Sequence, residues 1–263
     1  MVRRGLVAGR QSARRLIVDR KVLVDGSFAD KPARMVGTDQ AITLVAPPPP
    51  FVSRAGLKLQ GALDEFAIDP TDLVCLDAGS STGGFTDCLL QRGARRVVAV
   101  DVGTNQLHER IRDDRRVVVR EQTDIRLLRP DQFNRPFGLI VGDLSFISLR
   151  LVLPWLVPLL DPEGAMVLLI KPQFEAGRTE AARGQGVITD PAIWHRTMSE
   201  VLACAGNLGL QCRSVVPSAV PGTRGNVEFV AWLVRRTSGI ADDLASIGLV
   251  DQAVDRAAGE ADR

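Results

Sequence analysis

The chain has 263 residues, a hydrophobic fraction of 45% and a formal net charge of +2. This length favours two domains, or one catalytic domain with an appendage. The longest apolar run, residues 151–160, contains two prolines and is about half as long as a membrane span must be. No signal of charged, then apolar, then small residues opens the chain, so we expect a cytoplasmic protein with no membrane partner.

The cysteines and histidines give no sign of a metal site. Neither His108 nor His195 has partners at the spacing of metal ligands. The cysteines are scattered without CxxC spacing, which argues against zinc and against a disulfide framework; they are Cys75, Cys88, Cys204 and Cys212. We therefore expect free thiols and no bound metal.

Charge is segregated along the chain. Residues 1–50 hold nine Lys or Arg against four Asp, whereas residues 238–263 hold six acids against two Arg. This pattern predicts that the N-terminal segment meets a polyanion and that residues 238–263 are a solvated tail, either flexible or a short helix. The candidate contacts to the polyanion are Arg3, Arg4, Arg10, Arg14, Arg15, Arg20 and Lys21.

Residues 1–46 are predicted to form a small α+β unit. A basic helix is expected at 10–19, a strand and a turn from 21 onwards, and a second strand at 41–45. The four prolines at 47–50 have no backbone donors, so residues 47–52 are predicted to be a semi-rigid linker.

Residues 53–237 show the alternation of an α/β domain. Strands are expected at 73–76, 97–100, 117–119, 137–141, 165–170, 212–216 and 228–234, and helices at 85–91, 107–112, 149–160 and 191–208. Short, unbroken apolar runs between helices indicate a parallel sheet that is buried on both faces. Seven strands with a late antiparallel edge suit a Rossmann-like sheet of the methyltransferase type. The strand order does not follow from the sequence.

A glycine-rich turn follows the first of these strands. Gly79 permits a tight turn, but the segment lacks both the glycine spacing of dinucleotide binders and the lysine of a phosphate-binding loop. Asp77 favours a ligand with an ammonium group or a ribose, and S-adenosylmethionine has both and no phosphate. The alternative is a structural turn that Asp77 caps. The candidate cofactor contacts are Asp77, Gly79, Ser80, Ser81, Thr82, Gly83, Gly84 and Phe85.

Acids also follow the next two strands. Asp101, with Val102, is placed for the ribose hydroxyls, and Asp124 for the adenine amino group, because α/β sheets bind ligands at the carboxyl ends of their strands. Either acid alone could be a helix cap. Three acids at the ends of successive strands favour a cofactor site.

Four more charged residues are expected at this edge: Lys58, Asp143, Lys171 and Glu228. The chain has 29 Arg and only four Lys, so two lysines here are informative, since a desolvated Lys can lose its proton and an Arg cannot. A lysine whose pKa is lowered by a second lysine would accept the proton of a ribose hydroxyl or stabilise the alkoxide. The sequence does not say which lysine does so. The alternative is a buried ion-pair network that holds the strand ends.

Residues 173–190 are polar and contain three glycines. A loop of this length in a compact domain is usually a lid or a binding segment.

Five segments together resemble the TlyA family of ribosomal RNA 2′-O-methyltransferases, also labelled hemolysins, among the FtsJ-like enzymes. They are VSRAGLKL at 52–59, DAGSSTGGFT at 77–86, DLSFISL at 143–149, KPQFE at 171–175 and GNVE at 225–228. The resemblance covers residues 3–235. It implies Lys58, Asp143, Lys171 and Glu228 as the catalytic set and a cofactor site around residues 77–84 and Asp101.

The same resemblance implies a substrate: the ribose of cytidine in small-subunit rRNA and, in the actinobacterial branch, in large-subunit rRNA too. These modifications are tied to sensitivity to capreomycin-type antibiotics. Residues 2–6 and 12–17 are similar to the RNA-binding domain of ribosomal protein S-four, although the family pattern has further residues before Val2, so we expect a shortened domain. The prolines of the linker replace the Arg-x-Trp-Val-like segment of the actinobacterial branch.

We therefore predict a monomeric methyltransferase that acts on ribosomal subunits. A membrane-lytic hemolysin is the rival hypothesis, but the sequence contains no spanning segment and no strongly amphipathic cationic helix. An RNA-binding module on an inactive scaffold is a third hypothesis, against which all four charged residues argue.

Overall fold

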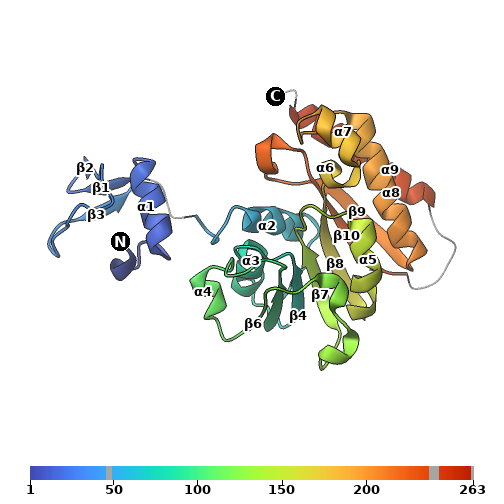
Figure 1. Ribbon diagram of the computed structural model, residues 1–263, viewed down its shortest axis with the longest axis horizontal. Helices are drawn as coiled ribbons and strands as arrows, with labels where there is room; N and C mark the ends of the chain where they lie inside the picture. Colours follow the sequence, from blue (N-terminus) through green and yellow to red (C-terminus); the bar gives the residue numbers. More distant parts are fainter. Residues whose placement is uncertain (46–48, 237–242, 262–263) are drawn as a thin grey trace. The chain divides into compact units, whose positions relative to one another are not determined.

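The computed structural model describes residues 1–45, 49–236 and 243–261 (Figure 1). The chain divides into two compact units, Met1–Val52 and Ser53–Arg263. The predicted linker, residues 47–52, falls at this division, and its residues 47 and 48 lie outside the described residues.

The first unit is one helix with a small antiparallel sheet. A 3-10 turn, η1 (Val2–Arg4), precedes helix α1 (Arg10–Val18), and the sheet has the order β2-β1-β3, with β1 at Val22–Val24, β2 at Ser27–Phe28 and β3 at Ile42–Leu44. Asp25 and Gly26 join β1 to β2 with φ of 51° and 81°, as a two-residue hairpin turn requires. The two-residue strand β2 was not predicted. The buried core of this unit consists of Val7, Leu16, Val22, Val24 and Ala29.

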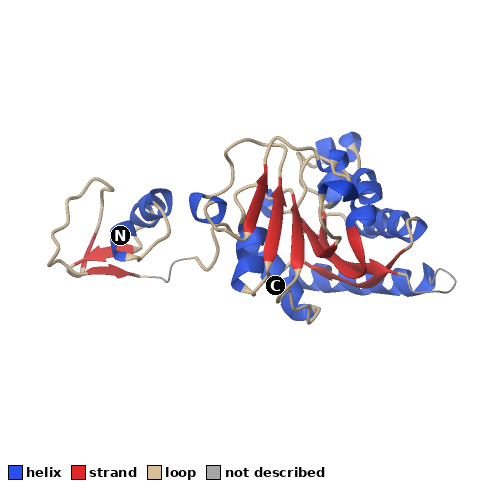
Figure 2. Cartoon of the chain, turned by 90° about the horizontal axis from the view of Figure 1, so that it is seen from below, coloured by secondary structure: helices blue, strands red, loops and turns tan. Residues whose placement is uncertain are grey.

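A seven-stranded sheet forms the centre of the second unit, in the order β6-β5-β4-β7-β8-β10-β9 (Figure 2). The strands are β4 (Val74–Ala78), β5 (Arg96–Val100), β6 (Val117–Arg120), β7 (Phe137–Gly142), β8 (Leu160–Ile170), β9 (Leu210–Pro217) and β10 (Phe229–Arg235). The antiparallel strand is β10, which pairs with both β8 and β9. It therefore lies inside the sheet and not at its edge, because the chain turns back after β9 and enters beside β8.

Helices cover both faces of this sheet. The bounds are α2 (Ala55–Glu65), α3 (Gly84–Gln91), α4 (Glu109–Arg112), α5 (Leu149–Leu156), α6 (Pro172–Glu175), α7 (Arg178–Arg183), α8 (Pro191–Asn207) and α9 (Asp243–Ala261). Helices α2 and α3 lie on one side of the sheet, and α5, α8 and α9 lie on the other (Figure 1). Short 3-10 turns complete the connections: η2 (Ile125–Leu127), η3 (Pro130–Gln132), η4 (Val157–Leu159) and η5 (Thr223–Gly225).

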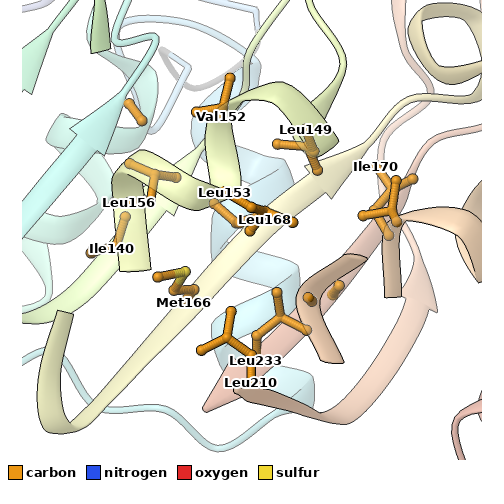
Figure 3. Close-up of a cluster of buried hydrophobic side chains, with 14 of the residues drawn as sticks. Ile140, Leu149, Val152, Leu153, Leu156, Met166, Leu168, Ile170, Leu210 and Leu233 are labelled. Carbon is orange, nitrogen blue, oxygen red and sulfur yellow. The ribbon is translucent and has the colours of Figure 1, made fainter. Parts of the chain in front are cut away.

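Alternate strand residues face the α5 layer. Leu76, Ile140, Met166 and Leu168 belong to one buried cluster with the apolar face of α5, as Figure 3 shows for most of them. Burying these side chains stabilises the fold by about 1.5–3 kcal/mol each. The predicted helix 149–160 ends earlier, at Leu156, and continues as η4, which contains Pro158.

Two expectations about polar segments were wrong. Residues 173–190 are not one long loop, since α6 and α7 lie in or at the edge of this stretch. Residues 243–261 form a helix, which was one of the two predicted alternatives, but α9 is not solvated, because its Val250, Ala253 and Ala257 are buried against the core. The acidic residues of α9 suggested that the segment is exposed to solvent, but one apolar stripe is enough for a helix to pack against a core. Residues 238–242 of the predicted tail lie outside the described part of the chain.

Candidate active site

The order of the sheet reverses between β4 and β7, which lie side by side with β5 beyond one and β8 beyond the other. The carboxyl ends of these two strands carry Asp77 with the glycine turn, and Asp143. Such a reversal is where open α/β sheets bind ligands, because the connections leave the edge in opposite directions.

The four predicted charged residues come together at this point. Lys58 Nζ lies 2.5 Å from Glu228 Oε2 and 3.8 Å from Asp143 Oδ2, and Lys171 Nζ lies 2.6 Å from Asp143 Oδ1. The two lysines and Glu228 are buried, and the Asp143 side chain is 16% exposed. Two ammonium groups and two carboxylates thus compensate one another, as burial of charge requires.

Each of these residues reaches the site from a different element. Asp143 and Lys171 follow β7 and β8 directly, and Glu228 precedes β10. Lys58 comes from α2, which packs closely on α3: a Cβ on Gly84 would lie 2.9 Å from Gly56 N and 3.1 Å from Ala55 Cβ. The glycine therefore permits the close packing that places Lys58 near the sheet edge.

Two further contacts of the site were not predicted. Lys171 Nζ donates to Ser145 Oγ over 3.0 Å, and Gln173 Nε2 donates to Glu228 Oε1 over 3.1 Å. Both residues lie in the same short motifs as Asp143 and Lys171. Only the position of these two residues inside the motifs at 143–149 and 171–175 could have pointed to them. A polar residue near a charged site residue has no sequence pattern of its own.

An exposed aromatic side chain stands beside the site. Phe146 is 91% exposed, has a φ of 63°, and its ring centroid lies 5.1 Å from that of Phe174, over which Lys171 Nζ lies at 5.5 Å. A positive φ in a bulky residue costs about 1–3 kcal/mol and is concentrated at functional sites.

The glycine turn presents a buried acid with one free oxygen. Asp77 Oδ2 accepts from the backbone N–H and the hydroxyl of Thr86, whereas Oδ1 is buried with no hydrogen-bond partner among the described residues. Burial raises the pKa of Asp77 to about 7, against the lowering effect of the Thr86 hydrogen bonds. A ligand ammonium group would satisfy this oxygen, so this acceptor fits the ammonium group of S-adenosylmethionine.

Asp101 contacts the predicted cofactor turn at Ser81. Its carboxylate accepts from Ser81 N over 2.8 Å and from Gly103 N over 2.7 Å. Val102 is 72% exposed beside it, an apolar surface suited to cover an adenine ring. Gly79 and Gly83 have φ of 83° and 92°, as expected for the turn. The other predicted contacts in this segment differ in exposure: Ser80, Gly84 and Phe85 are buried, and Ser81 and Thr82 are exposed. The Phe85 side chain is therefore part of the core, which leaves only its backbone to a ligand.

Asp124 has a local partner that the sequence did not reveal. It caps η2 by accepting from Arg126 N, and its carboxylate contacts the Arg126 guanidinium at 2.6 Å, which lowers the pKa of Asp124. Its contact with adenine stays a prediction. The unpredicted acid in this region is Glu121, which accepts from the N–H groups of residues 105–107 and from Arg112, and so fixes the loop after Asp101.

The predicted basic residues of the first unit are all exposed, but they do not form one set. Arg3, Arg4, Arg10 and Arg14 line a cavity of about 580 Å³ together with Lys31 and Arg34. The guanidinium of Arg4 also donates to the carbonyls of Gly37 and Gln40. The other three lie outside this cavity lining: Arg15 is 4.0 Å from Asp19, Arg20 lies over the Phe28 ring, and Lys21 follows in the chain.

Comparison with known proteins gives four results. The model of the FtsJ-like methyltransferase family matches residues 51–235. The 16S/23S rRNA (cytidine-2′-O)-methyltransferase TlyA of Mycobacterium tuberculosis is 46% identical over 99% of this chain and 96% of that protein. Hemolysin A of Brachyspira hyodysenteriae is 36% identical over 88% of this chain and 95% of that protein.

A solved structure from Streptococcus thermophilus that carries a hemolysin label superposes with a TM-score of 0.76. It is 36% identical and covers 97% of this chain and 94% of that chain. Within the described ranges, no helix of this protein combines the length and the apolar character that crossing a membrane demands.

Proposed function

Because this chain belongs to the TlyA family of FtsJ-like methyltransferases, we propose that it transfers a methyl group from S-adenosylmethionine to the ribose 2′-hydroxyl of a cytidine in ribosomal RNA. The observation that carries the proposal is the buried set of Lys58, Asp143, Lys171 and Glu228 beside the glycine turn. By analogy with the relative in M. tuberculosis, 16S and 23S rRNA are the proposed substrates, modified in the cytoplasm.

The cofactor site of this proposal lies at residues 77–84 and 101–102. Asp77 Oδ1 would hold the ammonium group, and Asp101 the ribose, with Val102 against the adenine ring. When bound, S-adenosylmethionine supplies a methyl group made electrophilic by its sulfonium sulfur.

The charged set would prepare the ribose oxygen. A ribose hydroxyl is a weak nucleophile near neutral pH, so its proton must be held or removed as it attacks. Lys171 Nζ, which contacts Asp143 and Ser145, would accept the proton of that hydroxyl or stabilise the negative charge that grows on its oxygen. Lys58 and Glu228 keep Asp143 oriented from the other side. The remaining acceleration would come from aligning the two reactants.

Two surfaces suit an RNA substrate. Residues 1–46 would act as the S-four-like RNA-binding domain through their exposed arginines, since phosphate contacts dominate RNA affinity. Phe146 offers an aromatic face next to Lys171, and unpaired bases stack on such faces in RNA recognition.

Transfer of a tritiated methyl group to isolated small and large ribosomal subunits, followed by mapping of the labelled ribose, tests this function. We expect label on a cytidine 2′-oxygen. Absence of label on both subunits would contradict the proposal. Release of dye from liposomes by the purified protein without S-adenosylmethionine would favour the hemolysin hypothesis instead.

A further inference from the structure

A further buried acid, Glu175, lies close to the charged set of Lys58, Asp143, Lys171 and Glu228. Glu175 ends helix α6, four positions after Lys171, and is 4% exposed. Its Oε1 accepts from the backbone N–H of Leu149 over 2.7 Å, and its Oε2 accepts from the Ser148 hydroxyl. Burial raises the pKa of Glu175, while these hydrogen bonds oppose the rise.

These bonds fix the start of helix α5. Ser148 is the N-cap of α5 and accepts from Arg150 N over 3.2 Å. The N-terminal N–H groups of a helix have no partner within the helix, so an acid that accepts from one of them holds the helix end in place. Glu175 thereby joins the segment after β8 to the segment after β7.

The segment that Glu175 holds is the one that carries Asp143 and Ser145. At its first end, Asp143 N donates to Ala78 O over 3.3 Å, and at its far end lies the Ser148–Glu175 bond. Between these two points Lys171 Nζ meets Asp143 and Ser145. Residues 143–148 and 171–175 are therefore joined by two sets of polar contacts, those of Lys171 and those of Glu175, in addition to the ring contact of Phe146 with Phe174.

An arginine extends the network to the surface. Arg150 Nη2 donates to the carbonyl of Glu175 over 3.0 Å, its Nε lies 3.4 Å from Glu175 Oε2, and its Nη1 donates to Glu200 Oε2 over 2.7 Å. The Glu200 side chain is 35% exposed, so its pair with Arg150 is partly screened by water. The contacts of Glu175 can therefore be altered separately from the pair of Arg150 with Glu200.

We propose that Glu175 is a positioning residue for methyl transfer, which sets residues 143–148 against Lys171 so that Asp143 and Ser145 meet the lysine amine. The inference rests on the proposed function. Glu175 touches no reacting group, so its effect passes through the geometry of the Lys171 contacts.

The test compares Glu175→Gln with Glu200→Gln in the full chain. Glu175→Gln has one acceptor oxygen in place of two. Its NH2 group faces either the Leu149 N–H or the Ser148 hydroxyl, whose oxygen already accepts from Arg150 N and Nε, and the negative charge beside Arg150 Nε is lost, so the segment shifts. A displacement of about 1 Å at a reacting group lowers kcat up to about a hundredfold, and we expect a loss of about tenfold or more at unchanged Kd for S-adenosylmethionine. Glu200→Gln weakens the two partly exposed pairs of Glu200, with Arg150 and with Arg196, and should keep kcat within about twofold.

The shape of the pH profile of kcat separates positioning from mere stability. A variant that is only less folded gives fewer active molecules with the same profile, whereas altered Lys171 contacts move the profile. Ser148→Ala removes the hydrogen bond from Ser148 to Glu175 and should move the pH profile of kcat in the same direction. This variant replaces Glu175→Gln in the test if Glu175→Gln does not fold. A folded Glu175→Gln variant with unchanged kcat and profile overturns the inference alone. Failure of the unaltered chain to methylate either subunit overturns the proposed function and this inference with it.

Discussion

At the level of single residues, the two lysines of the site compensate the charges of its two carboxylates. Lys58 contacts both Asp143 and Glu228, and Lys171 contacts Asp143. Removing one member leaves a buried partner without compensation, which costs about 3–5 kcal/mol in typical buried pairs. Measurements on these residues therefore need a folding readout beside the activity.

If Asp77 holds the ammonium group as proposed, we expect cofactor binding to depend on pH. Its pKa of about 7 means that the unliganded protein protonates this acid below neutral pH, whereas an ammonium ligand requires the carboxylate. The Kd for S-adenosylmethionine should therefore rise as pH falls below about 7, by up to about tenfold per pH unit, and level off above it. Calorimetric titration across this range measures the effect.

Asp77→Asn is the control for that experiment. The amide cannot titrate, so the variant should bind more weakly at high pH and lose the dependence on pH. A Kd for the unaltered chain that is flat on both sides of pH 7 would show that Asp77 does not hold the ammonium group.

Gly222 leaves room for the buried carboxylate of Glu228. A Cβ at this position would lie 2.2 Å from Glu228 Oε1, which is buried and bound to Gln173. We expect Gly222→Ala to push Glu228 away from Lys58, to lower kcat about tenfold and to destabilise the fold by about 1–3 kcal/mol. Gly248→Ala, where an added Cβ meets nothing, should leave methyl transfer unchanged. Wild-type kcat in Gly222→Ala would contradict the assigned position of Glu228.

At the scale of elements, the sequence predicted what local pattern determines. The unbroken apolar runs predicted all seven strands of the large sheet. Asp143 and Lys171 directly follow two of these strands, whereas Glu228 precedes the last strand and Lys58 lies on a helix. Strand order and the inside position of β10 depend on long-range pairing, which has no local signature. The role of Glu175 was not predicted for the same reason, because the partners of its carboxylate are 26 and 27 positions away in the chain.

Helix α9 is an integral part of the second unit. Ala253 is 2% exposed and belongs to the main core cluster. Ala253→Glu places a charge in that core and should lower the free energy of unfolding by about 3 kcal/mol. Gln252→Glu makes the same charge change at an exposed position and should stay within about 0.5 kcal/mol of the unaltered chain. Denaturant titration measures both, and equal stability of the two variants would argue against a packed α9.

Helix α1 is where we expect phosphate contacts. Arg10 and Arg14 are exposed one turn apart and line the same cavity. We expect the replacement of both with Ala to lower the steepness of a plot of log K for binding to ribosomal subunits against log salt concentration by about 1.5. Each phosphate contact releases counterions on binding, so the double variant, with fewer contacts, releases fewer. Arg213→Ala on the edge strand β9 is the matched control, with no change expected. An unchanged slope in the double variant would remove α1 from the RNA interface.

At the scale of the whole molecule, the two units divide the proposed work. The first unit supplies exposed cations, and the second supplies the cofactor turn and the charged set at the reversal of the sheet. The hemolysin labels of two relatives name a different activity. The chemistry of this site, with paired lysines and carboxylates beside an acid suited to an ammonium ligand, supports methyl transfer.

The most direct test of this account is Lys171→Ala in the full chain, measured both for S-adenosylmethionine binding and for methyl transfer to ribosomal subunits. Because Lys171 meets Asp143 and Ser145 and not the glycine turn, binding should stay within about twofold while transfer falls by about a hundredfold or more. Full turnover in this variant would contradict the assigned role of the charged set.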